Sequence, residues 1–121
     1  MKTLDQLINQ IKSNPDTIEF QDVINVIDAN YLYRQTRFTN GPVDDCIINE
    51  AGKNEGSCKI FSFAQIQHLD KHQTLSCFGH YYRDEVLNHP ENSDHANIRN
   101  FIKYGWLTVN FENAALEEKC R

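Results

Sequence analysis

The sequence predicts an α+β fold: a single compact domain in which about five helices pack around a small β-sheet. Three observations predict it. Apolar residues recur with helical spacing in five segments, and shorter segments alternate between apolar and polar residues as strands do. The chain has 121 residues, 40% of them hydrophobic, which is enough for one buried core. We therefore expect residues 1–121 to form one domain that ends in a short polar tail at 112–121.

Two amphipathic helices are predicted at the start of the chain. The apolar face of the first consists of Leu4, Leu7, Ile8 and Ile11. Thr3 and Gln6 have the spacing of a capping box, and Pro15 ends this helix. The second helix has the same spacing, with Phe20, Val23, Ile24 and Ile27 on its apolar face. Its expected cap is Asp16 or Thr17.

The next part of the chain is predicted to be extended. Residues 31–38 are aromatic and roughly alternating, which is typical of a strand. The sequence Asn40-Gly41-Pro42 predicts a turn, and the short apolar run 46–48 predicts a second strand. Residues 49–57 contain two glycines and no apolar periodicity, so we expect a turn there.

A third and a fourth helix follow this turn. Ser57 is the expected cap of the third, which is apolar nearly all round and should be buried. Its apolar residues are Ile60, Phe61, Phe63, Ala64 and Ile66. Asp70 and Gln73 form a second capping-box pattern, which starts the fourth helix. The apolar stripe of this fourth helix is Leu75, Phe78, Gly79, Tyr82 and Val86.

A fifth helix and a last strand complete the prediction. Ser93 or Asp94 should cap the helix, and Gly105 is well placed to end it. Its inward residues are Ile98, Phe101 and Ile102. Residues 106–111 then alternate cleanly, with Leu107, Val109 and Phe111 on one face.

Composition excludes several classes of function. The net charge of −5 argues against a general nucleic-acid binder and against adhesion to anionic membranes. Arg34, Arg37 and Lys59 are either a local basic patch or scattered surface charge. The four cysteines include no CxxC pair, and Cys58 and Cys77 lie in apolar segments, so we expect buried thiols and a reducing intracellular environment. No signal peptide, membrane span or cofactor motif is recognised.

The turn 49–58 is the first candidate site. A glycine-rich turn that leads into a helix presents backbone N–H groups and the positive end of the helix dipole, which can bind phosphate or carboxylate. The sequence lacks the glycine order of a P-loop or of a dinucleotide-binding fold. Glu50 and Glu55 would repel an anion. The alternative is a structural turn whose asparagine and glutamate side chains cap nearby backbone groups.

Cys58 is the second candidate, as a nucleophile in the first turn of a helix, where the dipole lowers a thiol pKa. His80 or His95 would be its base. The residues that could orient this base are Asp84, Asp94 and Asn97. The alternative is a buried, inert thiol.

A third candidate is a set of histidines and carboxylates that could hold zinc or iron: His80, Asp84, His89, Asp94 and His95. His80 and Asp84 share one face of a helix because they are four residues apart. No HExxH is present, and Asp94 is also an expected helix cap. We therefore predict no metal or cofactor, with this set as the alternative.

Polar aromatic and arginine side chains form the fourth candidate, either as a binding groove or as core residues with hydrogen-bonded tips. They are Tyr31, Tyr33, Tyr81, Tyr82, Trp106, Arg83 and Arg99. Seven residues are the candidate ligand-binding residues: Asn40, Asn54, Glu55, Ser57, Tyr81, Arg83 and Arg99.

Several motifs together resemble the HopJ type III effector family over about residues 20–111. The motifs are Tyr31-x-Tyr33, Phe38-x-Asn40-Gly41, the block from Asn49 to Phe61, Thr74-Leu75-x-Cys77-Phe78-Gly79, Tyr82-Arg83 and the block from Asp94 to Phe101. The resemblance implies a bacterial virulence protein that is delivered into host cells by type III secretion. It implies no catalytic residues.

Two functions remain open. The first is an effector, held in the bacterial cytoplasm before delivery, that binds a host protein or a small anion and has no catalytic centre. A secretion chaperone is a further candidate partner. The second is a non-secreted cytoplasmic protein with a small-molecule or enzymatic site that uses Cys58 with His80 or His95. The first function is preferred. The capped helix predicted for the first dozen residues argues against secretion, because type III signals are typically polar and flexible, and it keeps a non-secreted cytoplasmic protein as the alternative.

Overall fold

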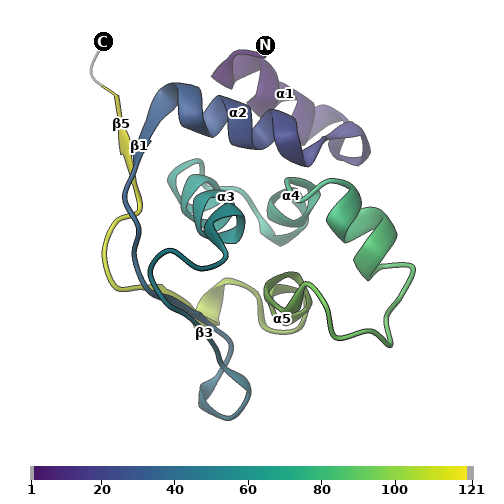
Figure 1. Ribbon diagram of the computed structural model, residues 1–121. Helices are drawn as coiled ribbons and strands as arrows, with labels where there is room; N and C mark the ends of the chain where they lie inside the picture. Colours follow the sequence, from purple (N-terminus) through teal and green to yellow (C-terminus); the bar gives the residue numbers. More distant parts are fainter. Residues whose placement is uncertain (1, 120–121) are drawn as a thin grey trace.

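The helices are stacked in layers, and the strands lie along one side of the stack (Figure 1). The computed structural model describes residues 2–119. Its α-helices are α1 (Leu4–Ser13), α2 (Phe20–Asn30), α3 (Glu55–Ile66), α4 (Lys71–Ser76) and α5 (Ala96–Tyr104). The pair α1 and α2 covers α3 and α4, and α5 packs against α4 from the other side. This arrangement confirms the predicted α+β class.

The strands form two small antiparallel sheets instead of the single sheet that was expected. They are β1 (Tyr31–Tyr33), β2 (Phe38–Asn40), β3 (Ile47–Asn49), β4 (Val109–Phe111) and β5 (Leu116–Glu118). One sheet has the order β3-β2-β4, with Phe38 opposite both Asn49 and Phe111. The other pairs β1 with β5, placing Tyr31 opposite Glu118. The segment that forms β5 was predicted to be part of the polar tail. Met1, Cys120 and Arg121 lie outside the described residues.

The predicted fourth helix and last strand are wrong in part, because a short helix of another type takes up some of each segment. The fourth helix does not run to Val86: it stops after Ser76, and the π-helix η3 (Tyr81–Val86) follows. The last strand does not begin at Trp106, because the 3-10 helix η4 (Gly105–Thr108) comes first and leaves Leu107 fully exposed to solvent. The remaining 3-10 helices are η1 (Pro15–Thr17) and η2 (Val43–Asp45).

The caps of α1 and α4 and the glycine that ends α5 were predicted correctly. Thr3 with Gln6, and Asp70 with Gln73, form capping boxes in which both hydrogen bonds are present. Gly105 ends α5 with a positive φ of 67°. Asp16 and Thr17 do not cap α2, because they are part of η1.

The caps predicted for α3 and α5 are also wrong. Asn54 precedes α3, three residues before the predicted Ser57, and His95 precedes α5. Both have a left-handed backbone with φ 53°, and neither makes a side-chain cap hydrogen bond. Asp94, the other expected cap, is instead paired with Arg99.

Phe61 on α3 is at the centre of the core. Its buried ring contacts the rings of Phe38, Phe78, Phe101 and Trp106 at centroid distances of 5.0–6.1 Å. These rings come from different helices and strands, so burying them joins the layers. Cys58 and Cys77 are buried as predicted, whereas Ile66 at the end of α3 is exposed. Within residues 2–119, no helix has the length and apolar character to cross a membrane.

Gly79 separates α4 from η3, and its position yields a prediction. Its φ is +58°, and a Cβ there would lie 2.6 Å from the backbone nitrogen of Phe20. We expect Gly79→Ala to lower the free energy of unfolding by about 2–4 kcal/mol, because the left-handed backbone strains the new side chain and the clash is with rigid backbone. Urea unfolding measures the change.

Gly52→Ala is the matched control. Gly52 also has a positive φ of 86°, but its Cβ would meet only the flexible end of Gln35, at 3.3 Å. We expect a loss of about 1 kcal/mol from the backbone alone. Equal losses in the two variants would contradict the close packing of Gly79 on α2.

Candidate functional site

A cavity of about 460 Å³ opens between the first turns of α3 and α5. Its apolar wall includes the rings of Phe20, Phe78 and Tyr81. Its polar wall includes Ser57 from α3 and Asn97 from α5. A cavity with aromatic walls and a few converging polar groups is typical of a ligand site. Residues far apart in the sequence meet here, including parts of three segments on which the family resemblance rests.

Both helix ends bring backbone N–H groups beside this cavity. The first donors bonded within the helices are the N–H groups of Cys58, to Asn54, and Arg99, to His95. The preceding residues Gly56 and Ala96 line the cavity. A left-handed residue followed by a helical one turns successive N–H groups to one side, which makes an anion-binding concavity. Two such ends around one cavity reinforce each other through their dipoles.

A network of buried asparagines fixes the two helix ends relative to each other. Asn49 and Asn97 exchange side-chain hydrogen bonds of 3.1 and 2.8 Å. The amide of Asn54 donates to Asn49 at 2.7 Å, which ties the start of α3 to the start of α5. Asn40 donates to Asn97, and Asn100 donates to the backbone carbonyl of Asn40. The network therefore also attaches the β2–β3 hairpin to α5.

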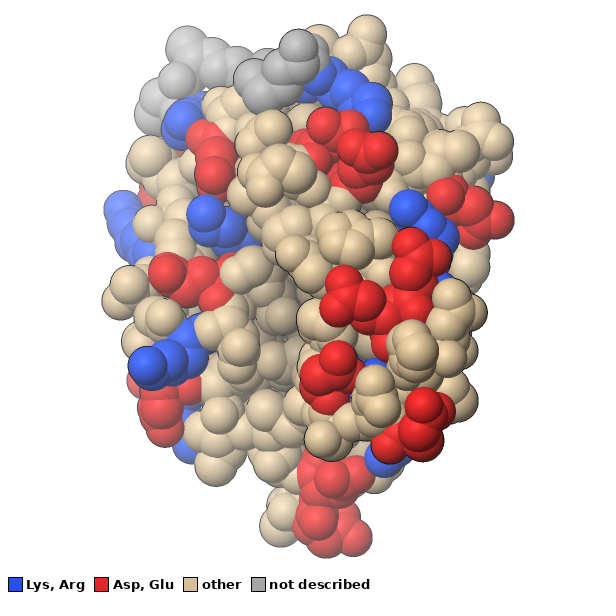
Figure 2. Space-filling view, turned by 45° about the vertical axis from the view of Figure 1, so that its right-hand side comes forward, with Lys and Arg blue, Asp and Glu red and all other residues tan. Residues whose placement is uncertain are grey.

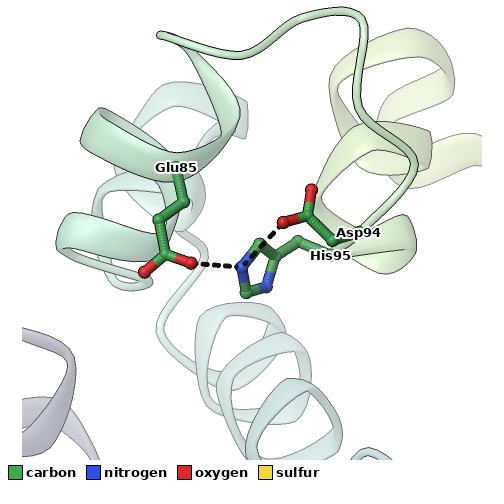
Figure 3. Close-up of side chains that lie close together, drawn as sticks. All are labelled: Glu85, Asp94 and His95. Carbon is green, nitrogen blue, oxygen red and sulfur yellow. Dashed lines mark hydrogen bonds and ion pairs between the residues drawn. The ribbon is translucent and has the colours of Figure 1, made fainter.

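A histidine and two carboxylates meet at one side of the cavity (Figure 3). Nε2 of His95 lies 2.8 Å from Oε1 of Glu85 and 3.8 Å from Oδ2 of Asp94. Nε2 of His80 lies 3.6 Å from the second oxygen of Glu85. The ring of Tyr81 lies beside both imidazoles, with centroid distances of 4.2 Å to His80 and 5.3 Å to His95.

Glu85 was not predicted as a site residue, because this segment was expected to be an α-helix. In an α-helix His80 would pair with Asp84, four residues later. In the π-helix η3 the hydrogen bonds connect residues five apart, as in the bond from Leu87 to Tyr82, and His80 pairs with Glu85. The described cluster thus combines Glu85 with three of the five metal candidates and does not contain Asp84 or His89. His89 lies near Glu91 instead.

The environment of Cys58 does not favour a nucleophile. Its side chain is 1% exposed, and burial raises the thiol pKa, so the reactive thiolate is disfavoured. The groups that act on its pKa after burial are Tyr33, Glu55 and Lys59, and neither candidate histidine is among them. Burial also raises the pKa of Cys77, to about 12. Both thiols therefore have the inert environment of core residues.

Three of the seven candidate ligand residues lie at the cavity, and the other four do not line it. Asn54, Ser57 and Tyr81 line the cavity. Asn40 is fully buried in the asparagine network, and Arg99 is held by Asp94 at 2.7 Å, which keeps the pKa of the Asp94 carboxyl below its usual value. Glu55 lies in the first turn of α3, and Arg83 in η3 has a buried Nη1 without a hydrogen-bond partner among the described residues.

The remaining aromatic and basic candidates do not join them in one groove. Trp106 donates to the carbonyl of Leu69, and Gln67 donates to Tyr31 in another part of the molecule. The basic residues are each paired with a carboxylate, as Arg34–Glu117, Arg37–Glu50 and Lys59–Asp28. Figure 2 shows both signs of charge scattered on one face, with acidic side chains gathered on its right-hand part.

Known proteins are similar to this chain in sequence and in structure. Residues 4–116 match the family described as HopJ type III effector protein. The chain belongs to this family. It is also similar to the crystal structure of a protein of unknown function, VPA0580, with 47% sequence identity and a TM-score of 0.92. The match covers 98% of this chain and 95% of VPA0580. Among curated proteins, none matches significantly. The HopJ resemblance predicted from the motifs is therefore confirmed, and the matched region extends closer to both termini.

The asparagine network yields a prediction that a double-mutant cycle tests. Asn49→Ala and Asn97→Ala should each destabilise the protein by about 2–4 kcal/mol, because each leaves buried amide groups without partners. The double variant should lose less than the sum, with a coupling of about 0.5–3 kcal/mol. Chemical unfolding measures all three. Asn92→Ala, at an exposed position, is the control and should change stability by less than about 0.5 kcal/mol. Additive losses would contradict a shared network.

Proposed function

We propose that this protein is a HopJ-type effector that acts by binding, and that the cavity between α3 and α5 is its binding site. The ligand is an aromatic or apolar group that carries a carboxylate or phosphate, either on a small molecule or on a host protein. The observation that carries the proposal is the meeting of two helix amino ends, neither with a side-chain cap, on one cavity with aromatic walls.

The backbone N–H donors beside this cavity support the binding of a ligand that carries a hydrogen-bond acceptor. The first-turn N–H groups of both helices are fixed by the backbone and by the asparagine network, so binding needs little reorganisation. The rings of Phe20, Phe78 and Tyr81 would contact the apolar part of the ligand. Binding without catalysis is favoured because the thiol of Cys58 is buried and protonated.

The cavity proposal can be tested with benzoate and phenyl phosphate as probes. Titration followed by amide chemical shifts should move the signals of Gly56, Ser57, Ala96 and Asn97 more than those of other residues. Ala96 is exposed at the cavity wall, so Ala96→Phe should fill the cavity without disturbing the core and should weaken binding by about tenfold or more.

Ala51→Phe is the control for that titration. Ala51 is exposed in the turn before α3 and does not line the cavity, so the variant should bind both probes like the unaltered protein. Benzylamine, which has the opposite charge, should not bind there. Shifts that are absent, or that persist unchanged in Ala96→Phe, would contradict the proposed site.

Delivery is a separate part of the proposal and has its own test. The whole chain fused to a translocation reporter should enter host cells from a strain with an active type III secretion system. It should not enter from an isogenic strain that lacks the apparatus. Equal signals from both strains, or none from the competent strain, would contradict delivery and favour a binding protein that stays in the bacterial cytoplasm.

A further inference from the structure

Three potential metal ligands converge beside the cavity from two different segments. Oε1 of Glu85, Oδ2 of Asp94 and Nε2 of His95 all lie within 4.8 Å of one another. Figure 3 shows both carboxylates directed at the same imidazole nitrogen, one from η3 and one from the residue before His95. In a tetrahedral zinc site with bonds of about 2.0–2.2 Å, ligand atoms lie about 3.3–3.6 Å apart. The observed separations of 2.8 and 3.8 Å lie on either side of that spacing.

Each carboxylate also has a basic partner on its other oxygen. His80 lies 3.6 Å from Oε2 of Glu85, and Nη2 of Arg99 lies 2.7 Å from Oδ1 of Asp94. Arg99 additionally bonds the backbone carbonyl of Asp94 through Nε. The Arg99 contact is a hydrogen bond, whereas His80 lies at ion-pair distance from Glu85. Metal-binding carboxylates are commonly oriented by such outer partners.

The backbone and its neighbours hold His95 in place. The residue has a left-handed conformation, with φ 53°, at the start of α5. Asn97 anchors that helix end in the buried network, and the ring of Tyr81 packs beside the imidazole. Strained backbone held by surrounding contacts is common at functional sites.

From these contacts we propose that Glu85, Asp94 and His95 bind one divalent zinc ion, with His80 and Arg99 as outer partners that orient the carboxylates. One imidazole and two carboxylates are a donor set that zinc accepts. Three protein ligands leave a fourth position for water or a further ligand. The ion reduces the negative charge beside the two helix ends. This site goes beyond the proposed binding function and does not depend on it.

The competing explanation is a simple ion pair between Glu85 and a protonated His95 that joins η3 to α5. The two explanations differ in what they require. Zinc needs a neutral imidazole and uses Asp94 as a third ligand, whereas an ion pair needs neither.

Isothermal titration of the full chain with zinc chloride near pH 7.5 tests the site. We expect one ion per chain, and at least about tenfold weaker binding in Glu85→Gln, Asp94→Asn and His95→Asn. Asparagine is chosen at position 95 because Asn54 shows that it accepts the same left-handed backbone, so the variant should fold. His80→Gln should weaken binding by about tenfold as the loss of an outer partner. His89→Asn is the matched control, because His89 is exposed and also lies near a glutamate.

Two further measurements separate the site from other zinc ligands. Cys46→Ser and Cys120→Ser should leave binding unchanged, because the proposed site contains no thiol. Histidine ring signals in NMR should show zinc on Nε2 of His95 with the proton on Nδ1, and no change at His89. Absence of binding below about 100 μM zinc, or binding that survives His95→Asn or disappears with the cysteines, would overturn the proposal. These titrations contain no cavity probe, so their failure is distinguishable from failure of the binding function.

Discussion

Asn49 and Asn97 exchange hydrogen bonds in the interior, and the geometry of the cavity depends on that exchange. Both side chains are almost fully buried, so neither amide can turn to water if its partner moves. Because Asn54 donates to the same Asn49 oxygen, one residue sets the position of both helix ends. An apolar pair of similar size would fill the space without fixing direction. The asparagines thus give the first turns of α3 and α5 one relative orientation, which a converging set of donors requires.

The second constraint is the change from α to π geometry after Gly79. α4 stops after Ser76, and the left-handed glycine lies between it and η3, where the backbone at the start of α2 passes closely. The wider turn moves the partner of His80 from Asp84 to Glu85. This one-residue displacement brings a carboxylate beside His95 and leaves Asp84 outside the cluster. The local backbone therefore decides which acid belongs to the site.

Sequence alone predicted what depends on near neighbours. The boxes Thr3–Gln6 and Asp70–Gln73 were found because each is a local pair, and α3 was recognised as buried from its own composition. Strand β5 was missed because Leu116 becomes a strand residue only by pairing with β1, which lies at the other end of the chain. The starts of α3 and α5 were misplaced because Asn54 and His95 have left-handed backbones without a side-chain cap hydrogen bond, so the sequence carries no capping pattern at these positions. His95 and Asp94 were correctly selected, but their companion Glu85 depended on the π-helix.

The net charge of the molecule favours cations, whereas the N–H donors of its cavity favour anions. Which effect dominates depends on the distance over which each acts. The net charge of −5 repels anions, but in physiological salt this repulsion decays over about 8 Å. Hydrogen bonds from the helix ends act only at contact, where they are directional and screened little. The proposed anionic ligand therefore has no long-range attraction to the protein and would be selected by fit, through an apolar part against Phe20 and Phe78. A cation at Glu85 and Asp94 is attracted at both ranges. Bound zinc would offset the two carboxylate charges beside the cavity, so the proposed metal and the proposed acidic ligand should each strengthen the binding of the other.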